Sequence, residues 1–234
     1  WSDLQVFCNS VTDHWATISI AGPHARDLLS EITDIDLDPR EFSFMDWREG
    51  RVAGISARVF RISFTGELSY EINVQADYAA SVWDSLMEHG TKYQICPYGT
   101  ETMHILRAEK GFIIVGQDTD GSITPKDLGL DWAIAKHKPF SFLGERGMER
   151  ADCTRRGRKQ LVGLETLDGS TVLKEGSQVV LNSNQTKPMD MAGHVTSSYM
   201  SPILGRSIAL ALVEDGHQRL GELVYVASEE QEMR

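Results

Sequence analysis

The sequence predicts an α+β domain followed by a small all-β domain. Residues 1–155 mix segments with alternating apolar residues, typical of strands, and segments with an apolar residue every three to four positions, typical of helices. Residues 156–234 contain short strand-like segments separated by turn residues, which is typical of a small barrel or sandwich. We therefore expect a domain boundary near residue 155, within a basic, turn-rich stretch.

Composition limits the class of protein. Hydrophobic residues make up 41% of the chain, enough for a core and too many for a disordered chain. The net charge of −11 argues against nucleic-acid and anionic-membrane partners, and no apolar run approaches the roughly 20 residues of a membrane span. Cys8, Cys96 and Cys153 form no zinc or disulfide pattern, so we expect a cytoplasmic protein.

The first segments predict a strand, a helix and a strand pair. Residues 15–20 alternate like a strand, and Gly22-Pro23 then favours a helix start, because proline is well tolerated in the first helical turn. Residues 42–47 and 51–55 are interpreted as two strands joined by a turn at Glu49-Gly50.

A second hairpin follows. Residues 60–64 and 68–74 are the expected strands, and residues 65–67 are the loop between them. Since successive side chains of a strand alternate, Tyr70 points to the apolar face and Glu71 to the polar one. On the polar face Glu71 lies between Ser69 and Asn73, and a glutamate in such a position most often faces water. A solvent-exposed Glu71 is therefore the alternative to a functional role.

Two helices are expected next. Asp77 is a suitable N-cap for the first, which ends at Gly90. The second follows Pro97 and ends at Gly111. Arg107 lies at the edge of its apolar face, where an arginine commonly packs its stem on the core and keeps its charge in water.

The segment after these helices carries mixed signals. Residues 112–115 are apolar and predict a short buried strand, and Asp118-Thr119-Asp120-Gly121 is interpreted as a turn because it lacks the remaining ligands of a calcium loop. Residues 124–127 are interpreted as a capped helix start. Trp132 is expected in the core, as a lone tryptophan usually is.

The C-terminal part predicts strands only. A polar tail is expected at residues 228–234. The expected strands cover residues 159–165, 177–182, 192–198, 207–213 and 222–227. The chain contains no P-loop, nucleophile elbow or zinc-protease motif, and its histidines have no metal-ligand spacing. Pattern alone therefore predicts the fold class and no metal, but no activity.

Several motifs resemble the folate-binding aminomethyltransferase family, which has the glycine-cleavage T-protein fold. The motifs are Phe64-Thr65-Gly66-Glu67-x-x-Tyr70-Glu71-Ile72, Leu106-Arg107-Ala108-Glu109-Lys110-Gly111, Phe142-Leu143-Gly144-Glu145-Arg146 and Gly193-His194-Val195-Thr196-Ser197. The resemblance implies a T-protein-like folate-binding α/β domain in residues 1–155, followed by a small C-terminal β-barrel in residues 156–234. The family aspartate near the reacting folate nitrogen belongs upstream of Trp1, so the N-terminal part of the domain is expected to be missing and no catalytic residue is assigned.

A narrower resemblance concerns the α subunits of heterotetrameric sarcosine oxidases. It rests on Arg58–Phe64, Tyr98–His104 and Gly116–Gly121. It implies that a flavin elsewhere in the complex oxidises sarcosine to an imine, and that tetrahydrofolate bound to this region accepts the one-carbon unit as 5,10-methylenetetrahydrofolate. Glycine and hydrogen peroxide are the other implied products. The implied partners are the β, γ and δ subunits and the rest of the α subunit, with flavin and NAD outside this chain, which alone is expected to be inactive.

The resemblance also implies a folate-binding set. Glu71 would accept the two donors of a pterin edge, Arg107 would meet the pterin carbonyl or the glutamate tail, and Trp132 would stack. Phe64, which stands where the family often has tyrosine, and Tyr70 complete the set.

Two alternatives stay open. One is another folate enzyme of the family, either a stand-alone aminomethyltransferase or a dimethylglycine- or sarcosine-dehydrogenase-type folate domain. The other is a non-catalytic interaction domain of the same fold.

Overall fold

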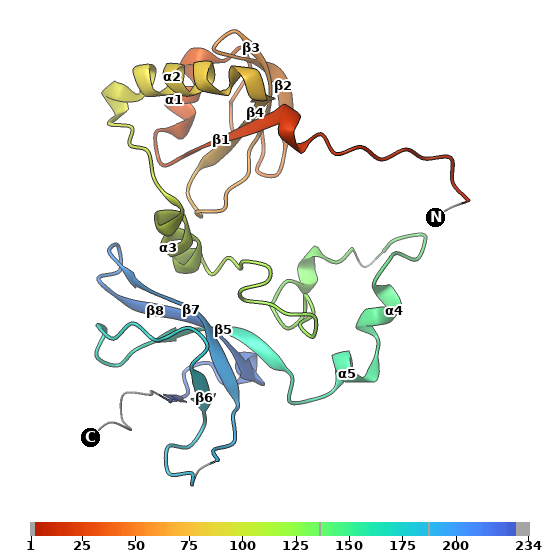
Figure 1. The fold of residues 1–234 in the computed structure, drawn as a ribbon, viewed down its shortest axis with the longest axis vertical. Coiled ribbons are helices and arrows are strands. Elements are labelled where there is room, and N and C mark those ends of the chain that lie inside the picture. The colour runs from red at the N-terminus through yellow and green to blue at the C-terminus, as the bar shows by residue number, and fades with distance from the viewer. Residues whose placement is uncertain (1–2, 136, 187, 228–234) are drawn as a thin grey trace. The chain divides into compact units, whose positions relative to one another are not determined.

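The chain forms two compact units. The computed structural model describes residues 3–135, 137–186 and 188–227. The units meet in sequence inside helix α3 (Thr100–Lys110), between Met103 and His104 (Figure 1). This division reflects where contacts concentrate, and the domain boundary near residue 155 stays a prediction.

The first unit is an antiparallel sheet with two helices packed on it. In the described part of this unit the strand order is β1-β4-β3-β2. Both helices pack against the sheet and against each other (Figure 1). The elements are η1 (Thr12–His14), β1 (Trp15–Ala21), α1 (Ala25–Ile32), β2 (Trp47–Val52), β3 (Ile55–Phe60), β4 (Ser69–Gln75), η2 (Ala76–Tyr78), α2 (Ala79–Gly90) and η3 (Thr91–Tyr93).

The core of the first unit lies between β4 and the helices. Tyr70, Ile72 and Val74 of β4 are fully buried in one cluster with Leu29 of α1 and Val82 of α2. The predicted alternation along this strand is therefore confirmed. It follows that Glu71 points to the opposite face of the sheet, away from both helices.

The predicted turn at Glu49-Gly50 is wrong. Gly50 lies inside β2, where a side chain would come within 2.4 Å of Ile35 Cγ1, so its role is close packing. The turn is formed by Ala53 and Gly54, whose φ angles of 49° and 77° match a two-residue hairpin turn.

Two other boundaries in the first unit differ from the prediction. β3 ends at Phe60, and residues 61–68 form a loop that leaves the sheet, with Arg61 N donating to Asp46 O. Asp77 does not cap α2, because it lies within the short 3-10 helix η2 and α2 begins after Tyr78 without a side-chain cap.

The second unit is built on an antiparallel sheet of the order β5-β8-β7-β6-β9 within the described residues. All of the strands expected after residue 156 are present, and the tail predicted at residues 228–234 lies outside the described residues. The elements are η4 (Asp131–Ala133), α4 (Glu145–Met148), α5 (Ala151–Thr154), β5 (Lys159–Glu165), β6 (Gln178–Val180), β7 (Gly193–Ser201), β8 (Arg206–Glu214), η5 (Gly216–Gln218) and β9 (Tyr225–Val226).

Three predictions between residues 112 and 132 are wrong. Residues 112–115 form a loop rather than a strand, because the backbone of Ile114 donates to the Asp118 carboxylate. Thr124 and Asp127 form the predicted cap, with Thr124 N donating to the Asp127 carboxylate and Asp127 N donating to the Thr124 hydroxyl, but residues 125–129 continue as turns instead of a helix. Trp132 is 76% exposed in η4 and does not belong to the core.

Candidate functional site

Glu71 occupies the centre of the sheet face that the helices leave open. It pairs in register with Ser19 of β1 on one side and with Phe60 of β3 on the other. Glu71 is half-buried, and burial raises the pKa of its carboxyl group above the ordinary value. Within the described residues neither a hydrogen bond nor an ion pair reaches this carboxylate. Its acceptor positions are therefore partly desolvated and free to meet a ligand.

The polar side chains next to Glu71 bond to each other instead. Thr17 Oγ1 donates to Asn73 Oδ1 over 2.6 Å, and the hydroxyls of Ser19 and Ser69 are 3.5 Å apart. These pairs link β1 to β4 on both sides of Glu71. They form a hydrogen-bonding rim around Glu71 without neutralising its charge.

Aromatic side chains lie on the other side of Glu71. Phe60, its neighbour on β3, stacks on Trp47 of β2 with ring centroids 6.0 Å apart and an interplanar angle of 21°. Further along the same face Arg58 lies over the Trp15 ring at 5.0 Å and pairs with Glu49 at 2.9 Å. The open face thus combines one free carboxylate with flat apolar surfaces.

Two other predicted site residues of the first unit lie elsewhere. Tyr70 is fully buried, and its hydroxyl accepts a hydrogen bond from Arg26 Nε at 3.0 Å, so it acts as a core residue in this structure. Phe64 is half-buried in the loop between β3 and β4. A contact of Phe64 or Tyr70 with folate stays a prediction.

Arg107, in the second unit, is fully buried in a polar network. Its Nη1 donates to Asp118 at 2.5 Å and to Phe112 O at 3.1 Å, while Nη2 donates to Ser197 at 2.7 Å and to Tyr199 at 3.2 Å. Only its buried Nε lacks a partner in the part of the chain that the structure describes. The expected exposed charge at a helix edge is therefore wrong, and a contact of Arg107 with folate stays a prediction.

Asp118 is the centre of this network, and sequence reasoning missed it. Besides Arg107, its carboxylate accepts from the hydroxyls of Thr196 (2.5 Å) and Ser197 (2.7 Å). Both hydroxyls reach it because β7 has a register shift between Val195 and Ser197, which lets consecutive side chains serve one acceptor. Gly116-Gln117-Asp118 is the only signal in the sequence, and a motif alone does not reveal a partner about 80 residues away.

The predicted folate-binding set is thus divided between the units. Phe64, Tyr70 and Glu71 lie in the first, and Arg107 and Trp132 lie in the second. Among the three in the first unit, Glu71 is the one whose polar group has no protein partner within the described residues.

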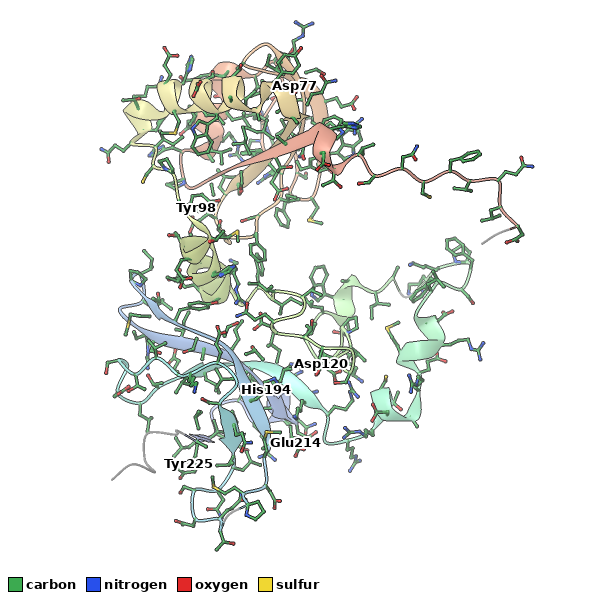
Figure 2. All side chains as sticks on the ribbon, viewed as in Figure 1. Asp77, Tyr98, Asp120, His194, Glu214 and Tyr225 are labelled. Carbon is green, nitrogen blue, oxygen red and sulfur yellow. The ribbon has the colours of Figure 1, made fainter. Side chains whose placement is uncertain are left out.

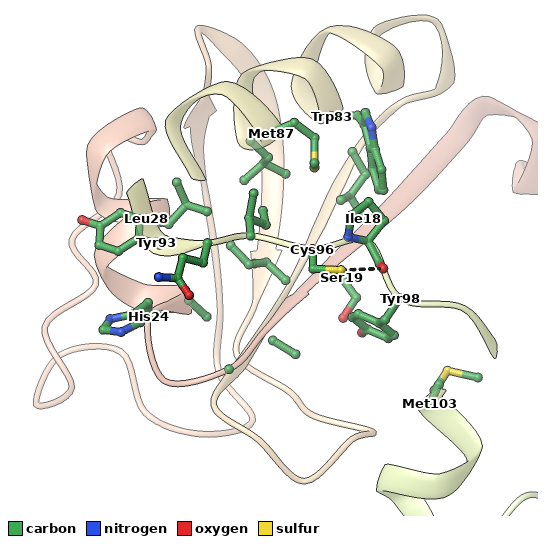
Figure 3. A pocket seen from close by; sticks show the side chains of 18 of the residues that line it. Ile18, Ser19, His24, Leu28, Trp83, Met87, Tyr93, Cys96, Tyr98 and Met103 are labelled. Atoms are coloured by element: carbon green, nitrogen blue, oxygen red, sulfur yellow. Dashed lines mark hydrogen bonds between the residues drawn. The ribbon is translucent and has the colours of Figure 1, made fainter. Parts of the chain in front are cut away.

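A cavity of about 660 Å³ lies along β1 in the first unit (Figure 3). Ile18 of β1, Leu28 of α1, Trp83 and Met87 of α2, and Tyr98 line it. Thr17 and Ser19 of the rim around Glu71 also line it, but Glu71 does not. The free carboxylate makes the Glu71 face, and not the cavity, the candidate site.

The second unit holds a histidine with an altered titration. Burial lowers the pKa of His194, nearby Lys159 lowers it further, and Asp120 opposes the shift (Figure 2). Over the described ranges no group of three or more His, Cys, Asp or Glu is placed to hold a metal ion. The helices found there are also too short or too polar to cross a membrane.

Comparison with known proteins assigns the family. The family model of the GCVT N-terminal domain matches residues 1–138, and that of the glycine cleavage T-protein C-terminal barrel domain matches residues 159–234. The chain therefore belongs to the glycine cleavage T-protein family. The solved aminomethyltransferase T of the glycine cleavage system from Bartonella henselae has the same fold, with a TM-score of 0.75 and 22% identity over 92% of this chain and 56% of that one.

Curated relatives narrow the resemblance. The chain is 44% identical over 230 residues to a sarcosine oxidase subunit alpha from Corynebacterium sp. strain P-1, covering 96% of this chain and 23% of the relative. It is 33% identical over 225 residues to an aminomethyltransferase from Thermotoga petrophila, covering 96% of this chain and 57% of the relative. The resemblance to sarcosine oxidase α subunits and the mixed α/β fold are confirmed. The chain spans only 23% of the sarcosine oxidase subunit, so the activity of the whole protein is a matter for proposal.

Proposed function

We propose that this chain is the tetrahydrofolate-binding part of a sarcosine oxidase α subunit. The family assignment and the 44% identity to such a subunit support this class of function. The observation that carries the proposal is Glu71, a half-buried carboxylate on an open sheet face with no partner among the described residues.

Glu71 fits the edge of a pterin. A pterin presents a 2-amino group beside a ring N–H, so two donors lie in one plane, and a carboxylate accepts both at once. Each bond would involve a charged acceptor, which makes it about twice as strong as a neutral one. The bonds would also compensate for the solvent that Glu71 loses in the fold.

The proposed role in the reaction is positioning. Tetrahydrofolate, when bound, supplies the nitrogen that attacks the imine carbon formed from sarcosine, and 5,10-methylenetetrahydrofolate and glycine are the products. Glu71 would hold the pterin edge and thereby fix where that nitrogen lies, which converts a bimolecular encounter into an oriented one. We assign no acid or base in this chain.

The remaining parts of the activity belong to the whole complex. We expect flavin and NAD to be bound by other parts of the α subunit or by the β, γ and δ subunits. Sarcosine oxidation, with formation of hydrogen peroxide from oxygen, would then take place there. Copurification of flavin-bearing subunits with this chain would support that assembly. A cytoplasmic location rests on the cysteine pattern and stays a prediction.

The first test is a titration of tetrahydrofolate into this chain and into the intact subunit that contains it. Glu71→Gln replaces one acceptor oxygen by a donor and removes the charge, so we expect binding to weaken about 10- to 100-fold. Calorimetry or equilibrium dialysis would measure the dissociation constant.

Glu88→Gln is the matched control. Glu88 is an exposed carboxylate on α2 in the same unit, and its replacement is expected to leave binding unchanged. An absence of tetrahydrofolate binding in the folded chain and in the intact subunit would contradict the proposal and favour an interaction domain of the same fold.

A further inference from the structure

The strand register brings Glu71, Phe60 and Trp47 into one row. Phe60 is the register partner of Glu71 across β3 and β4, and Trp47 is the register partner of Phe60 across β2 and β3. Partners in register point to the same face of a sheet, so the row runs from a carboxylate to two aromatic rings. Neighbouring strands are about 4.8 Å apart, so the row crosses about 10 Å, which a flat bicyclic ring reaches together with its hydrogen bonds to Glu71.

The two rings form a surface before any ligand binds. Their planes differ by 21° and their centroids are 6.0 Å apart, which is a stacked arrangement within the range of favourable aromatic pairs. Trp47 is 49% exposed, although it is a large apolar side chain on a regular strand. Because α1 and α2 pack on the other face, they leave this pair open.

We propose that Phe60 and Trp47 are the stacking platform for the ring whose donors Glu71 accepts. The inference rests on the proposed function and adds the residues that select the ligand by ring size. A ring held edge-on by Glu71 and lying across the neighbouring strands covers Phe60 first and Trp47 next. A one-ring ligand bonded to Glu71 reaches Phe60 only, so the platform favours a bicyclic pterin.

The free carboxylate favours a pterin over a protein partner as the ligand of this open sheet face. An interface that covered the open face would bury Glu71, and an unpaired buried carboxylate is costly. A pterin supplies the two missing donors and a flat apolar face in one rigid molecule. A pterin thus matches both the unpaired carboxylate of Glu71 and the aromatic rings of Phe60 and Trp47.

The test uses tetrahydrofolate and two of its parts. 6-Methyltetrahydropterin contains the bicyclic ring without the tail, and p-aminobenzoylglutamate contains the tail without the ring. Trp47→Leu and Phe60→Leu keep apolar bulk but remove the flat surface. Stacking on an aromatic side chain contributes to the binding free energy, so we expect either variant to weaken binding of tetrahydrofolate about tenfold. Binding of 6-methyltetrahydropterin should weaken by the same factor.

Trp83→Leu is the matched control. Trp83 is 44% exposed on α2, which packs on the face of the sheet opposite Glu71, so its replacement is expected to leave all three dissociation constants unchanged. Tryptophan fluorescence gives a second readout: the ligand should quench the wild-type emission, and Trp47→Leu should reduce that quenching while Trp83→Leu keeps it.

The outcomes separate the platform from the folate site itself. Binding of tetrahydrofolate that depends on Glu71 but is unchanged by Trp47→Leu and Phe60→Leu would overturn the platform and leave the proposed function standing. A weakening seen for p-aminobenzoylglutamate but not for 6-methyltetrahydropterin would overturn it as well, since the rings would then hold the tail. If tetrahydrofolate binds neither the folded wild-type chain nor the intact subunit, both proposals fail together, and the wild-type titration alone identifies that case.

Discussion

At the scale of single residues, Glu71 combines loss of solvent with the absence of a protein partner in the described part of the chain. Its pKa is raised because burial disfavours the charged form. A group of this kind is typical of binding sites, where a ligand and not the fold supplies the compensating contact. Tyr70, one position earlier, shows the opposite outcome, since its hydroxyl is satisfied inside the protein by Arg26.

The raised pKa of Glu71 predicts a pH-dependent cost to stability. An acid with a higher pKa in the folded state than in the unfolded state binds more protons when folded, so stability falls as pH rises between the two values. We therefore expect Glu71→Gln to be more stable than the wild type at pH 7, and this difference to shrink as pH falls toward about 4.3, the ordinary pKa of a glutamate, below which the carboxyl group is protonated in both states. Thermal denaturation of both proteins at several pH values measures it. A stability difference that is the same at pH 4 and pH 7 would show that the Glu71 charge is not its source.

At the scale of the elements, the hairpin of β2 and β3 shows how one glycine can be mistaken for another. Gly50 and Gly54 both lie near the predicted turn, but only Gly54 has a positive φ, and Gly50 makes room for Ile35. Ala53 takes the first turn position with φ 49°, a conformation that residues with a Cβ adopt at some cost. Asn-Gly is the preferred pair in a turn of this kind.

Ala53→Asn should therefore stabilise the protein. Asparagine tolerates the left-handed conformation better than alanine, and we expect a gain of about 0.5–1 kcal/mol in the free energy of unfolding. Gly54→Ala is the converse control and should destabilise by a similar or larger amount, since alanine is strained at φ 77°. Chemical denaturation measures both, and a destabilising Ala53→Asn would contradict this assignment of the turn.

At the scale of the whole molecule, buried ion pairs fasten irregular segments to the sheet of the second unit. Arg107 and Asp118 join α3 and the loop after it to β7. Arg158, the residue before β5, pairs with Asp127 and also donates to Ser122 O, which holds the next loop. Burial acts to raise the pKa of Asp127, but hydrogen bonds from Arg158 and Thr124 outweigh it, so this pKa lies below the ordinary value of an aspartate. Removing one partner of such a pair destabilises the protein, because the charge of the other partner stays buried without compensation.

Asp118→Asn tests the role of this network. The substitution leaves the Arg107 charge uncompensated, and we expect a loss of about 3 kcal/mol in the stability of the second unit. Relative to the wild type, Asp118→Asn should accelerate amide hydrogen exchange more in β7 and β8 than in β4 of the first unit. Asp120→Asn, two residues further on and exposed, is the control and should cost less than about 1 kcal/mol. Equal effects of the two substitutions would contradict a central role for Asp118.

The sequence by itself determined the features that depend on local patterns. Strand alternation predicted the opposite faces of Tyr70 and Glu71, and helical periodicity with Gly111 as the stop predicted α3. Only the tertiary structure decided which glycine forms the β2–β3 turn, that Asp118 neutralises a fully buried Arg107, that Trp132 is exposed, and that Phe60 and Trp47 lie in one row with Glu71. The physical reason is that alternation and periodicity are set by neighbouring residues, whereas burial, ion pairing and register depend on strands and helices that meet from distant parts of the chain.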